Sequence, residues 1–278
     1  MEQKDKDIFE QTTKFNTGIK LYMFQTGTIK TKIKFIKMNQ GEEPFEIPVP
    51  WFLIKHPKGD IIIDGGMPIE TAIDKHKHWG SVIEAYDPVM KKSEWCRDQI
   101  KTVNTNPEDI KYVIQTHLHL DHSGAIGHFP NATHITQRLE YDYAFNPDWF
   151  SQPAYIRDDF DKPNIRWKFL QGRKTDFYDV HGDGVIKIIF TPGHTPGHQS
   201  VLVNLPKTGH MLFTGDACYT EDHWCDKCLP GLVASSSDAA ESVSKLRKVA
   251  KEHEATVVWG HDPISWKIWK KAPMFYYD

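Results

Sequence analysis

The segment Thr116-His117-Leu118-His119-Leu120-Asp121-His122 is the most informative stretch of the chain. Its last six positions hold three imidazoles and one carboxylate. In an extended or loosely coiled loop, His117 and His119 point the same way, while Asp121 and His122 reach toward a neighbouring point. One short loop can therefore hold two cations, and a solvated histidine-rich loop is the alternative. The pattern predicts a dinuclear metal site.

Length and composition are those of an ordinary globular protein. With 278 residues, 39% of them hydrophobic and 12% aromatic, the chain can bury a large core, and we expect a single domain over 1–278. The formal net charge of -3 provides no broad cationic surface, which argues against nucleic acid or an anionic membrane as partner and favours a small-molecule substrate. No apolar run approaches the roughly 20 residues that cross a bilayer, so no integral membrane segment is expected.

The cysteines give an expectation about compartment. Cys96, Cys218, Cys225 and Cys228 are too few for a disulfide framework in a chain of this length. Residues 1–7 lack the apolar run of a secretory signal, so the expected location is the cytoplasm, although a trimmed chain would look the same. Cys225 and Cys228 have the Cys-x-x-Cys spacing of a redox pair or half a zinc site, but no second pair is suitably spaced, and we interpret them as loop thiols.

Short apolar runs between turn residues predict buried strands. The first unit is a hairpin, in which residues 49–54 and 60–64 flank the turn His56-Pro57-Lys58-Gly59. Further runs of this type lie at 112–115, 185–190, 200–205, 211–213 and 256–259.

Two helices are expected among these strands. One begins at Asp238, with Glu241 at capping-box spacing. Its inner stripe consists of Val243, Leu246, Val249 and Ala250. The other follows Ser93. Strands with helices between them indicate layered sheets covered by helices, in an α/β or α+β sandwich.

The remaining candidate ligands also follow predicted strands. His194, Asp216 and His261 each come just past the end of a strand, as the loop of His117 does. Scaffolds assemble active sites by grouping polar residues at one edge of a sheet. We therefore expect the loops that follow these strands to converge on one site.

The candidate donors suffice for two ions. They are His117, His119, His122, His194, His261, Asp121 and Asp216. Two tetrahedral or five-coordinate ions need about six to eight protein and solvent ligands, and one carboxylate can bridge both. Imidazole-rich ligation favours Zn²⁺ over Mg²⁺ or Ca²⁺, with Mn²⁺, Fe²⁺ or Co²⁺ as substitutes. The expected cofactor is two Zn²⁺ per chain.

The chain resembles the metallo-β-lactamase superfamily, and within it the N-acyl homoserine lactonases, which are quorum-quenching enzymes. The matching segments are 116–124 (THLHLDHSG), 191–200 (TPGHTPGHQS), 216–220 (DACYT), 260–262 (GHD) and 63–68 (IDGGMP). The resemblance covers roughly residues 20–265. It implies an α/β fold, an αβ/βα sandwich of two mixed sheets flanked by helices, with a dimetal site at the sheet edges.

The resemblance also implies roles for individual residues. One metal is held by His117, His119 and His194, the other by Asp121, His122 and His261, and Asp216 bridges them. Tyr219 is implied as a catalytic hydrogen-bond donor to the substrate carbonyl, and packing through its ring is the alternative. Asp121 passes a proton to the leaving alkoxide. Asp64 resembles a carboxylate that orients a ligating imidazole, and a turn-capping aspartate is the alternative.

An aromatic-rich segment suggests where an acyl chain binds. We expect residues 138–182 to form a helical cap over the site, partly exposed and rich in aromatic side chains. The expected groove residues are Leu120, Trp149, Phe150 and Tyr155. Leu120 stands where many members of the family carry an aromatic residue. Residues 24–38 are the alternative place for the chain.

The implied activity is opening of the lactone ring of N-acyl homoserine lactones. Because the metal ligands do not select the bond that is cleaved, a thioesterase resembling glyoxalase II and an organophosphate hydrolase are alternatives. Lys267, Lys270 and Lys271 could anchor a glutathione thioester or form a solvated helix face. A non-catalytic module would bind zinc without turnover. Both a monomer and a homodimer are left open.

Overall fold

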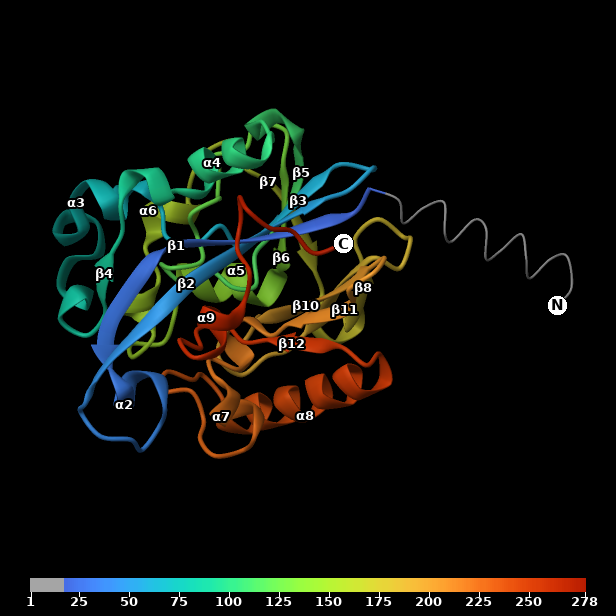
Figure 1. Ribbon diagram of the computed structural model, residues 1–278. Coiled ribbons are helices and arrows are strands. Elements are labelled where there is room, and N and C mark those ends of the chain that lie inside the picture. Colours follow the sequence, from blue (N-terminus) through green and yellow to red (C-terminus); the bar gives the residue numbers. More distant parts are fainter. Residues whose placement is uncertain (1–17) are drawn as a thin grey trace, which may run out of the picture.

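The computed structural model describes residues 18–278 and contains two β-sheets that pack face to face (Figure 1). One sheet has seven strands in the order β4-β1-β2-β3-β5-β6-β7, and the other has five in the order β12-β11-β10-β9-β8. Residues 1–7, on which the compartment prediction rests, lie outside the described residues. Within residues 18–278, no helix has both the length and the apolar character needed to span a bilayer.

The seven-stranded sheet is mixed. Its strands are β4 (Asp87–Val89), β1 (Lys20–Lys32), β2 (Pro44–Lys55), β3 (Asp60–Ile63), β5 (Ile110–Ile114), β6 (Thr133–Gln137) and β7 (Arg166–Leu170). Strands β1, β2 and β3 pair antiparallel, as the predicted hairpin requires, whereas β3, β5, β6 and β7 are parallel neighbours.

The five-stranded sheet is also mixed. Its strands are β12 (Thr256–Val258), β11 (Gly209–Phe213), β10 (Gln199–Leu205), β9 (Ile186–Phe190) and β8 (Phe177–Asp179). Strand β10 is antiparallel to both β9 and β11, and β11 is parallel to β12. The carboxyl ends of β9, β11 and β12 therefore lie at the same edge of this sheet.

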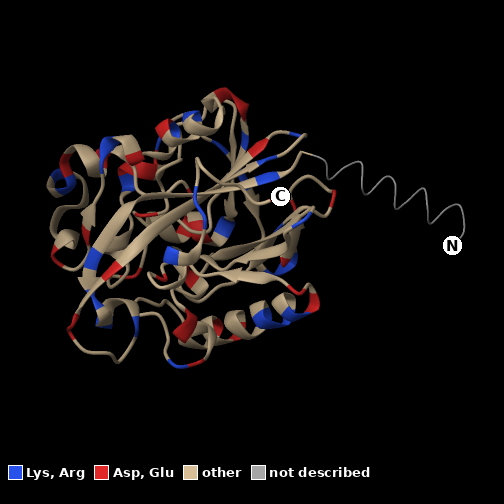
Figure 2. Ribbon diagram, in the orientation of Figure 1, with Lys and Arg blue, Asp and Glu red and all other residues tan. Residues whose placement is uncertain are grey.

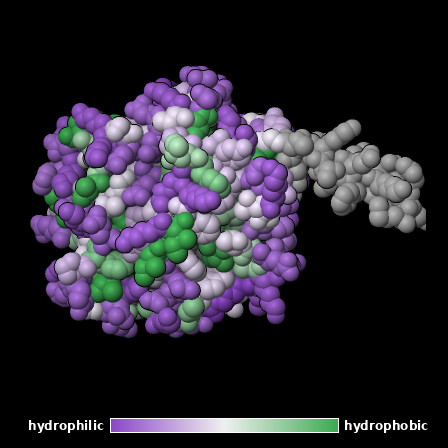
Figure 3. All heavy atoms as spheres, viewed as in Figure 1, coloured by the Kyte–Doolittle hydropathy of each residue, from purple (hydrophilic) through white to green (hydrophobic). Residues whose placement is uncertain are grey.

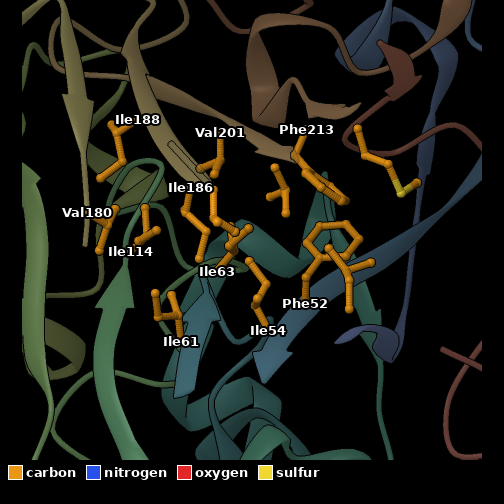
Figure 4. Packing of buried hydrophobic residues seen from close by; sticks show 14 of the residues in the cluster. Phe52, Ile54, Ile61, Ile63, Ile114, Val180, Ile186, Ile188, Val201 and Phe213 are labelled. Atoms are coloured by element: carbon orange, nitrogen blue, oxygen red, sulfur yellow. The ribbon is translucent and has the colours of Figure 1, made fainter. Parts of the chain in front are cut away.

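The main core lies between the two sheets. Figure 4 shows Phe52, Ile54, Ile61, Ile63 and Ile114 of the first sheet facing Val180, Ile186, Ile188, Val201 and Phe213 on the other side. All of these are at most 7% exposed. Burying one such side chain contributes about 1.5–3 kcal/mol, so this layer is the principal source of stability.

Helices cover the outer face of each sheet. The helices are α2 (Ile33–Ile36), α3 (Ile69–Trp79), α4 (Cys96–Gln99), α5 (Arg138–Phe145), α6 (Arg157–Phe160), α7 (Glu221–Trp224), α8 (Ser236–Glu252) and α9 (Ser265–Ile268). Short 3₁₀ turns lie at Gly80–Glu84, Lys92–Glu94, Ile100–Val103, Pro107–Asp109, Gln152–Ala154, Gly172–Thr175 and Gly215–Ala217. Leu53 packs with Cys96 on one side, and Leu212 packs with Leu246 of α8 on the other. The order helix, sheet, sheet, helix is the predicted αβ/βα sandwich.

Two helix predictions need correction. Helix α8 begins at Ser236, not at Asp238, because Ser235 is its N-cap and accepts a hydrogen bond from the Asp238 N–H at 3.3 Å. The predicted inner stripe of this helix is buried. The helix predicted after Ser93 is a single turn, α4, followed by a 3₁₀ turn.

The segment 138–182 has a mixed structure. Helices α5 and α6 belong to it, and the Leu120 N–H donates to the Ala154 carbonyl at 2.9 Å, which joins the segment to the histidine-rich loop. Beyond Phe160 the chain forms β7 and β8, which are the edge strands of the two sheets. The helical part of the expected cap is therefore confined to its first half.

Charged side chains are spread over the surface without a broad field of one sign. Figure 2 shows lysine, arginine and acidic residues interspersed on the ribbon, including along α8. In the view of Figure 3, hydrophilic residues cover most of the molecular face, with apolar residues between them. This surface agrees with the net charge of -3 and with a small-molecule substrate.

Candidate metal centre

The loops that follow four strands meet at one place. The His117 loop follows β5, His194 follows β9, Asp216 follows β11 and His261 follows β12. A Cβ atom at Gly260 would lie 2.6 Å from the Gly215 carbonyl oxygen, so the last two loops approach so closely that a side chain has no room. The predicted convergence is present.

The two oxygens of Asp216 face two pairs of histidines. Oδ2 lies 3.6 Å from His117 Nε2 and 3.3 Å from His194 Nε2. Oδ1 lies 3.4 Å from His122 Nε2 and 3.1 Å from His261 Nε2. A carboxylate that presents one oxygen to each of two groups of imidazoles has the arrangement of a bridging ligand.

The remaining donors extend both groups. His119 Nδ1 is 3.0 Å from His194 Nε2, and Asp121 Oδ2 is 3.6 Å from His261 Nε2. Three sets of donors have ligand atoms within 4.8 Å of one another: His117, His119 and His194; His117, His122 and Asp216; and Asp121, His122 and His261. The first and third sets contain the same residues that the sequence resemblance assigned to two separate ions.

The donor atoms fit metal ions. Within the described part of the chain, His117 Nε2, His122 Nε2 and Asp216 Oδ1 are buried and have no hydrogen-bond partner. Buried polar atoms without partners are costly, and here their residues gather around common points. Burial lowers the pKa of His117 and of His119 well below the usual range, which favours the neutral imidazole that binds metals.

Electrostatics favour a positive charge among these groups. Burial raises the pKa of Asp216, but His122, His261 and His117 lower it more, so the pKa lies well below its usual range. Burial lowers the pKa of His122, and nearby carboxylates, that of Asp216 foremost, raise it well above its usual range. Metal cations held between the carboxylates and the imidazoles would supply this positive charge.

A cavity of about 590 Å³ opens onto the donors. Its floor contains His119, Asp121, Asp216, Tyr219 and His261, and its walls are formed largely by Ile29, Phe35, Ile36, Ile47, Val82, Tyr86, Leu120, Phe150, Pro153 and Leu232. The walls are therefore mainly apolar and the floor is polar. This combination is typical of sites that bind an apolar group and act on a polar one.

Comparison with known proteins identifies the family. A family model described as the metallo-beta-lactamase superfamily matches residues 45–261. The chain belongs to the metallo-β-lactamase superfamily. The N-acyl homoserine lactonase AttM of Rhizobium radiobacter is 59% identical to it over 261 residues, covering 94% of this chain and 99% of that protein.

Relatives with lower sequence identity to this chain are also N-acyl homoserine lactonases or lactone hydrolases by name. An N-acyl homoserine lactonase of Bacillus sp. is 33% identical over 221 residues, covering 79% of this chain and 83% of that protein. A solved N-acyl homoserine lactone hydrolase, with the product N-hexanoyl-L-homoserine bound at its catalytic metal center, has a TM-score of 0.82. That structure is 28% identical and covers 92% of this chain and 98% of its own. The resemblance drawn from the sequence motifs is confirmed.

Asp64 supports one side of this metallo-β-lactamase site. One of its oxygens accepts from the Thr116 N–H at 2.7 Å, and the other lies 2.8 Å from His122 Nδ1. The Thr116 hydroxyl donates to it at 2.9 Å. Asp64 has a left-handed φ of 63°, a costly conformation for a residue other than glycine. These contacts turn His122 Nε2 toward Asp216, the orienting arrangement that the resemblance implied.

His198 also supports the site, although the sequence analysis did not single it out. Its side chain is buried, and its Nε2 accepts from the Asp216 N–H at 3.0 Å. Its Nδ1 lies 3.0 Å from the Thr191 carbonyl oxygen. His198 therefore fixes the backbone that carries the Asp216 carboxylate. It stands in the quoted TPGHTPGH segment, but only the fold reveals its contact with Asp216.

Tyr219 lies at the floor of the cavity beside the histidines. Its ring packs edge-on against His194 with centroids 5.4 Å apart, and its hydroxyl lies 3.2 Å from His194 Nδ1. His194 Nδ1 is also 3.0 Å from the Leu232 carbonyl oxygen, so its hydrogen is directed at oxygen acceptors. Burial raises the pKa of Tyr219 well above the usual range, which keeps the phenol protonated.

Of the four residues expected to form the groove, two line the cavity and two do not. Leu120 and Phe150 line the cavity. Trp149 is 85% exposed, and Tyr155 is 8% exposed with its ring 4.6 Å from that of His119, so neither lies among the lining residues. Within the alternative region 24–38, Ile29 of β1 and Phe35 and Ile36 of α2 also line the cavity. A larger share of the lining comes from residues 81–86, which carry no chemical motif that a sequence could reveal.

The other singled-out side chains lie away from the metal centre. Cys225 is exposed and Cys228 half-buried, and both are unpaired. Among residues 18–278, neither belongs to a group of three metal-capable side chains. Lys267, Lys270 and Lys271 are not among the residues that line the cavity, which removes the expected anchor for a glutathione thioester.

Proposed function

We propose that this protein hydrolyses the lactone ring of N-acyl homoserine lactones with two divalent ions, preferably Zn²⁺, held by the seven donors described above. The observation that carries the proposal is the meeting of Tyr219, Asp121 and the Asp216-centred donor set at the floor of one apolar-walled cavity. The AttM relative, named an N-acyl homoserine lactonase, supports the choice of substrate. The product is the N-acyl homoserine.

The side chains divide the chemistry between them. Bound divalent ions would supply Lewis acidity and lower the pKa of water toward neutrality. Tyr219 donates its phenolic hydrogen to the lactone carbonyl oxygen as negative charge develops there. Asp121 lines the same cavity and carries a proton to the ring oxygen that leaves. The apolar walls hold the acyl chain and exclude water from it.

A substrate panel tests the proposal. The purified protein is incubated with acyl homoserine lactones of short and long chain, a glutathione thioester and a phosphotriester, and proton release is followed. We expect the lactones to be hydrolysed with the highest kcat/KM. Faster hydrolysis of the thioester or the phosphotriester would assign another hydrolytic activity, and bound zinc without any turnover would indicate a metal-binding module.

Tyr219→Phe should lower turnover by about ten- to a hundredfold. One oxyanion donor is worth about 10²–10³ in rate when it is the main donor, and here the ions share that function. Metal content should not change, because the ring remains in place. Steady-state kinetics with elemental analysis measures both, and Tyr276→Phe, at the partly exposed Tyr276, is the matched control. An unaltered rate would leave Tyr219 as a packing residue.

Phe150→Ala should reduce kcat/KM for long-chain lactones more than for short-chain ones. Each buried methylene is worth about 0.8 kcal/mol, or roughly fourfold, so loss of part of the cavity wall should change the ratio by about four- to tenfold. Trp149→Ala is the matched control. Trp149 precedes Phe150 in the chain, but its side chain is 85% exposed and is not among the residues that line the cavity. Equal losses across chain lengths in Phe150→Ala would place the acyl chain against residues 29–47.

A further inference from the structure

Glu140 of α5 is a fully buried carboxylate with four hydrogen-bond donors. Oε1 accepts from the Leu118 N–H at 3.0 Å and from the Tyr155 hydroxyl at 3.1 Å. Oε2 accepts from the Thr195 hydroxyl at 2.5 Å and from the Gly197 N–H at 3.2 Å. These four donors are all neutral groups, and burial raises the pKa of the Glu140 carboxyl.

The four donors belong to segments that carry one ligand set. Leu118 lies between His117 and His119 in the chain, and Thr195 follows His194. Tyr155 packs its ring against His119 with centroids 4.6 Å apart. A single carboxylate therefore joins the two loops that supply His117, His119 and His194. Asp64 contacts His122 of the other ligand set directly, and it reaches His117 only through the Thr116 hydroxyl, which lies 3.0 Å from His117 Nδ1.

The packing around Glu140 leaves no freedom for these loops. A Cβ atom at Gly197 would lie 2.2 Å from the Glu140 backbone nitrogen, so α5 and the loop of His194 are in direct backbone contact. The buried carboxylate then accepts hydrogen bonds from both loops at once. Side chains and backbone together fix the distance between His119 and His194.

We propose that Glu140 is a positioning residue for the ion held by His117, His119 and His194. It acts through the hydrogen bonds that it accepts from Leu118 and Thr195, which hold the loops of His119 and His194 at a fixed spacing. The inference rests on the metal assignment made in the proposed function. It also predicts asymmetry, because Glu140 contacts residues next to His117, His119 and His194, whereas the direct contact of Asp64 with a ligand is made to His122.

Glu140→Gln tests this directly. The amide keeps the shape of the carboxylate but turns one acceptor oxygen into a donor, which cannot satisfy the Gly197 or Leu118 N–H that faces it. The variant is made in two backgrounds: His261→Ala, which leaves the first ligand set intact, and His119→Ala, which leaves the second intact. Apo protein is titrated with Co²⁺ against a chromophoric chelator, and the visible spectrum of the bound ion is recorded.

We expect Glu140→Gln to weaken Co²⁺ binding about ten- to a hundredfold in the His261→Ala background, with an altered spectrum, and less than about threefold in the His119→Ala background. Asp64→Asn is the matched variant and should weaken binding in the His119→Ala background, because Asp64 contacts His122 directly. Unaltered affinity, or equal weakening in both backgrounds, overturns the positioning role.

Far-UV circular dichroism and thermal melting establish that each variant folds. If Glu140→Gln does not fold, Tyr155→Phe decides, because it removes one donor to Oε1 and retains the ring against His119. Its weakening should again be confined to the His261→Ala background, and an equal effect in both backgrounds overturns the inference. Failure of the wild-type chain to bind Co²⁺ would instead overturn the metal assignment of the proposed function.

Discussion

Asp216→Ala should lower lactone hydrolysis by at least about a thousandfold, which corresponds to about 4 kcal/mol of transition-state free energy. The reason is geometric. The two carboxylate oxygens lie 3.1–3.6 Å from four imidazole nitrogens, so no other described side chain is placed between both histidine pairs. Without the bridge, two divalent ions would repel each other with no shared anion between them, and the content of bound metal should fall as well.

Kinetics and elemental analysis on the same preparation measure the two effects of Asp216→Ala. Asp98→Ala is the control, because its carboxylate pairs with Lys101 on the surface and such pairs contribute little. Its metal content and rate should equal those of the wild-type chain. Retained activity with two ions in Asp216→Ala would mean that another group bridges them.

The convergence of the candidate metal ligands could be predicted because each of them sits in a short local pattern. The histidine-rich loop contains four donors in six positions, and the other three donors follow apolar runs of strand length. A strand of this kind can be predicted from its own residues, without knowledge of the strands with which it pairs. The strands that deliver the ligands, β5, β9, β11 and β12, are likewise short and apolar, and they were expected within one or two residues of their observed ends.

Other strands were not predicted because their pattern is polar. Strand β1 mixes lysine, threonine and glutamine with apolar residues, and its register shifts between Gln25 and Thr28. Strand β6 reads THITQ, yet most of it is buried. Gln137 in this strand donates to the Gln199 side chain at 2.8 Å. Such polar strands are stable only when a partner from the other sheet satisfies them, and that partner is distant in the sequence.

Asp64 was expected from the resemblance, but the supporting residues His198 and Glu140 were missed for the same reason. Glu140 reads as an ordinary helical glutamate, and its function depends on donors 15 to 57 positions away. Phe35 and Ile36 form part of the cavity wall because the turn between β1 and β2 reaches the 229–232 segment, where the Gly231 N–H donates to the Ile36 carbonyl at 3.0 Å. Candidate metal ligands can be recognised from a short stretch of sequence. The residues that support them and the walls of the cavity are brought into place only by tertiary contacts.

Removal of metal by a chelator should abolish turnover, by at least about a thousandfold, and should lower the melting temperature. Elemental analysis of the active protein should give two ions per chain. The thermal effect follows from linkage, since ions bound at a thousand times their dissociation constant stabilise the folded state by about 4 kcal/mol. It also follows from burial, because the ions would satisfy His117 Nε2 and His122 Nε2, which have no other partner in the described structure.

Addition of Zn²⁺ after removal of the chelator should restore both the rate and the melting temperature, and Co²⁺ or Mn²⁺ should restore them in part. Titration of the apo protein separates the two ions. If both are required, activity should appear only as the second equivalent binds, because His117, His119 and His194 form one complete ligand set and Asp121, His122 and His261 another. Full activity at one equivalent would contradict the dinuclear mechanism, and it would leave Asp216 as a ligand to a single ion instead of a bridge.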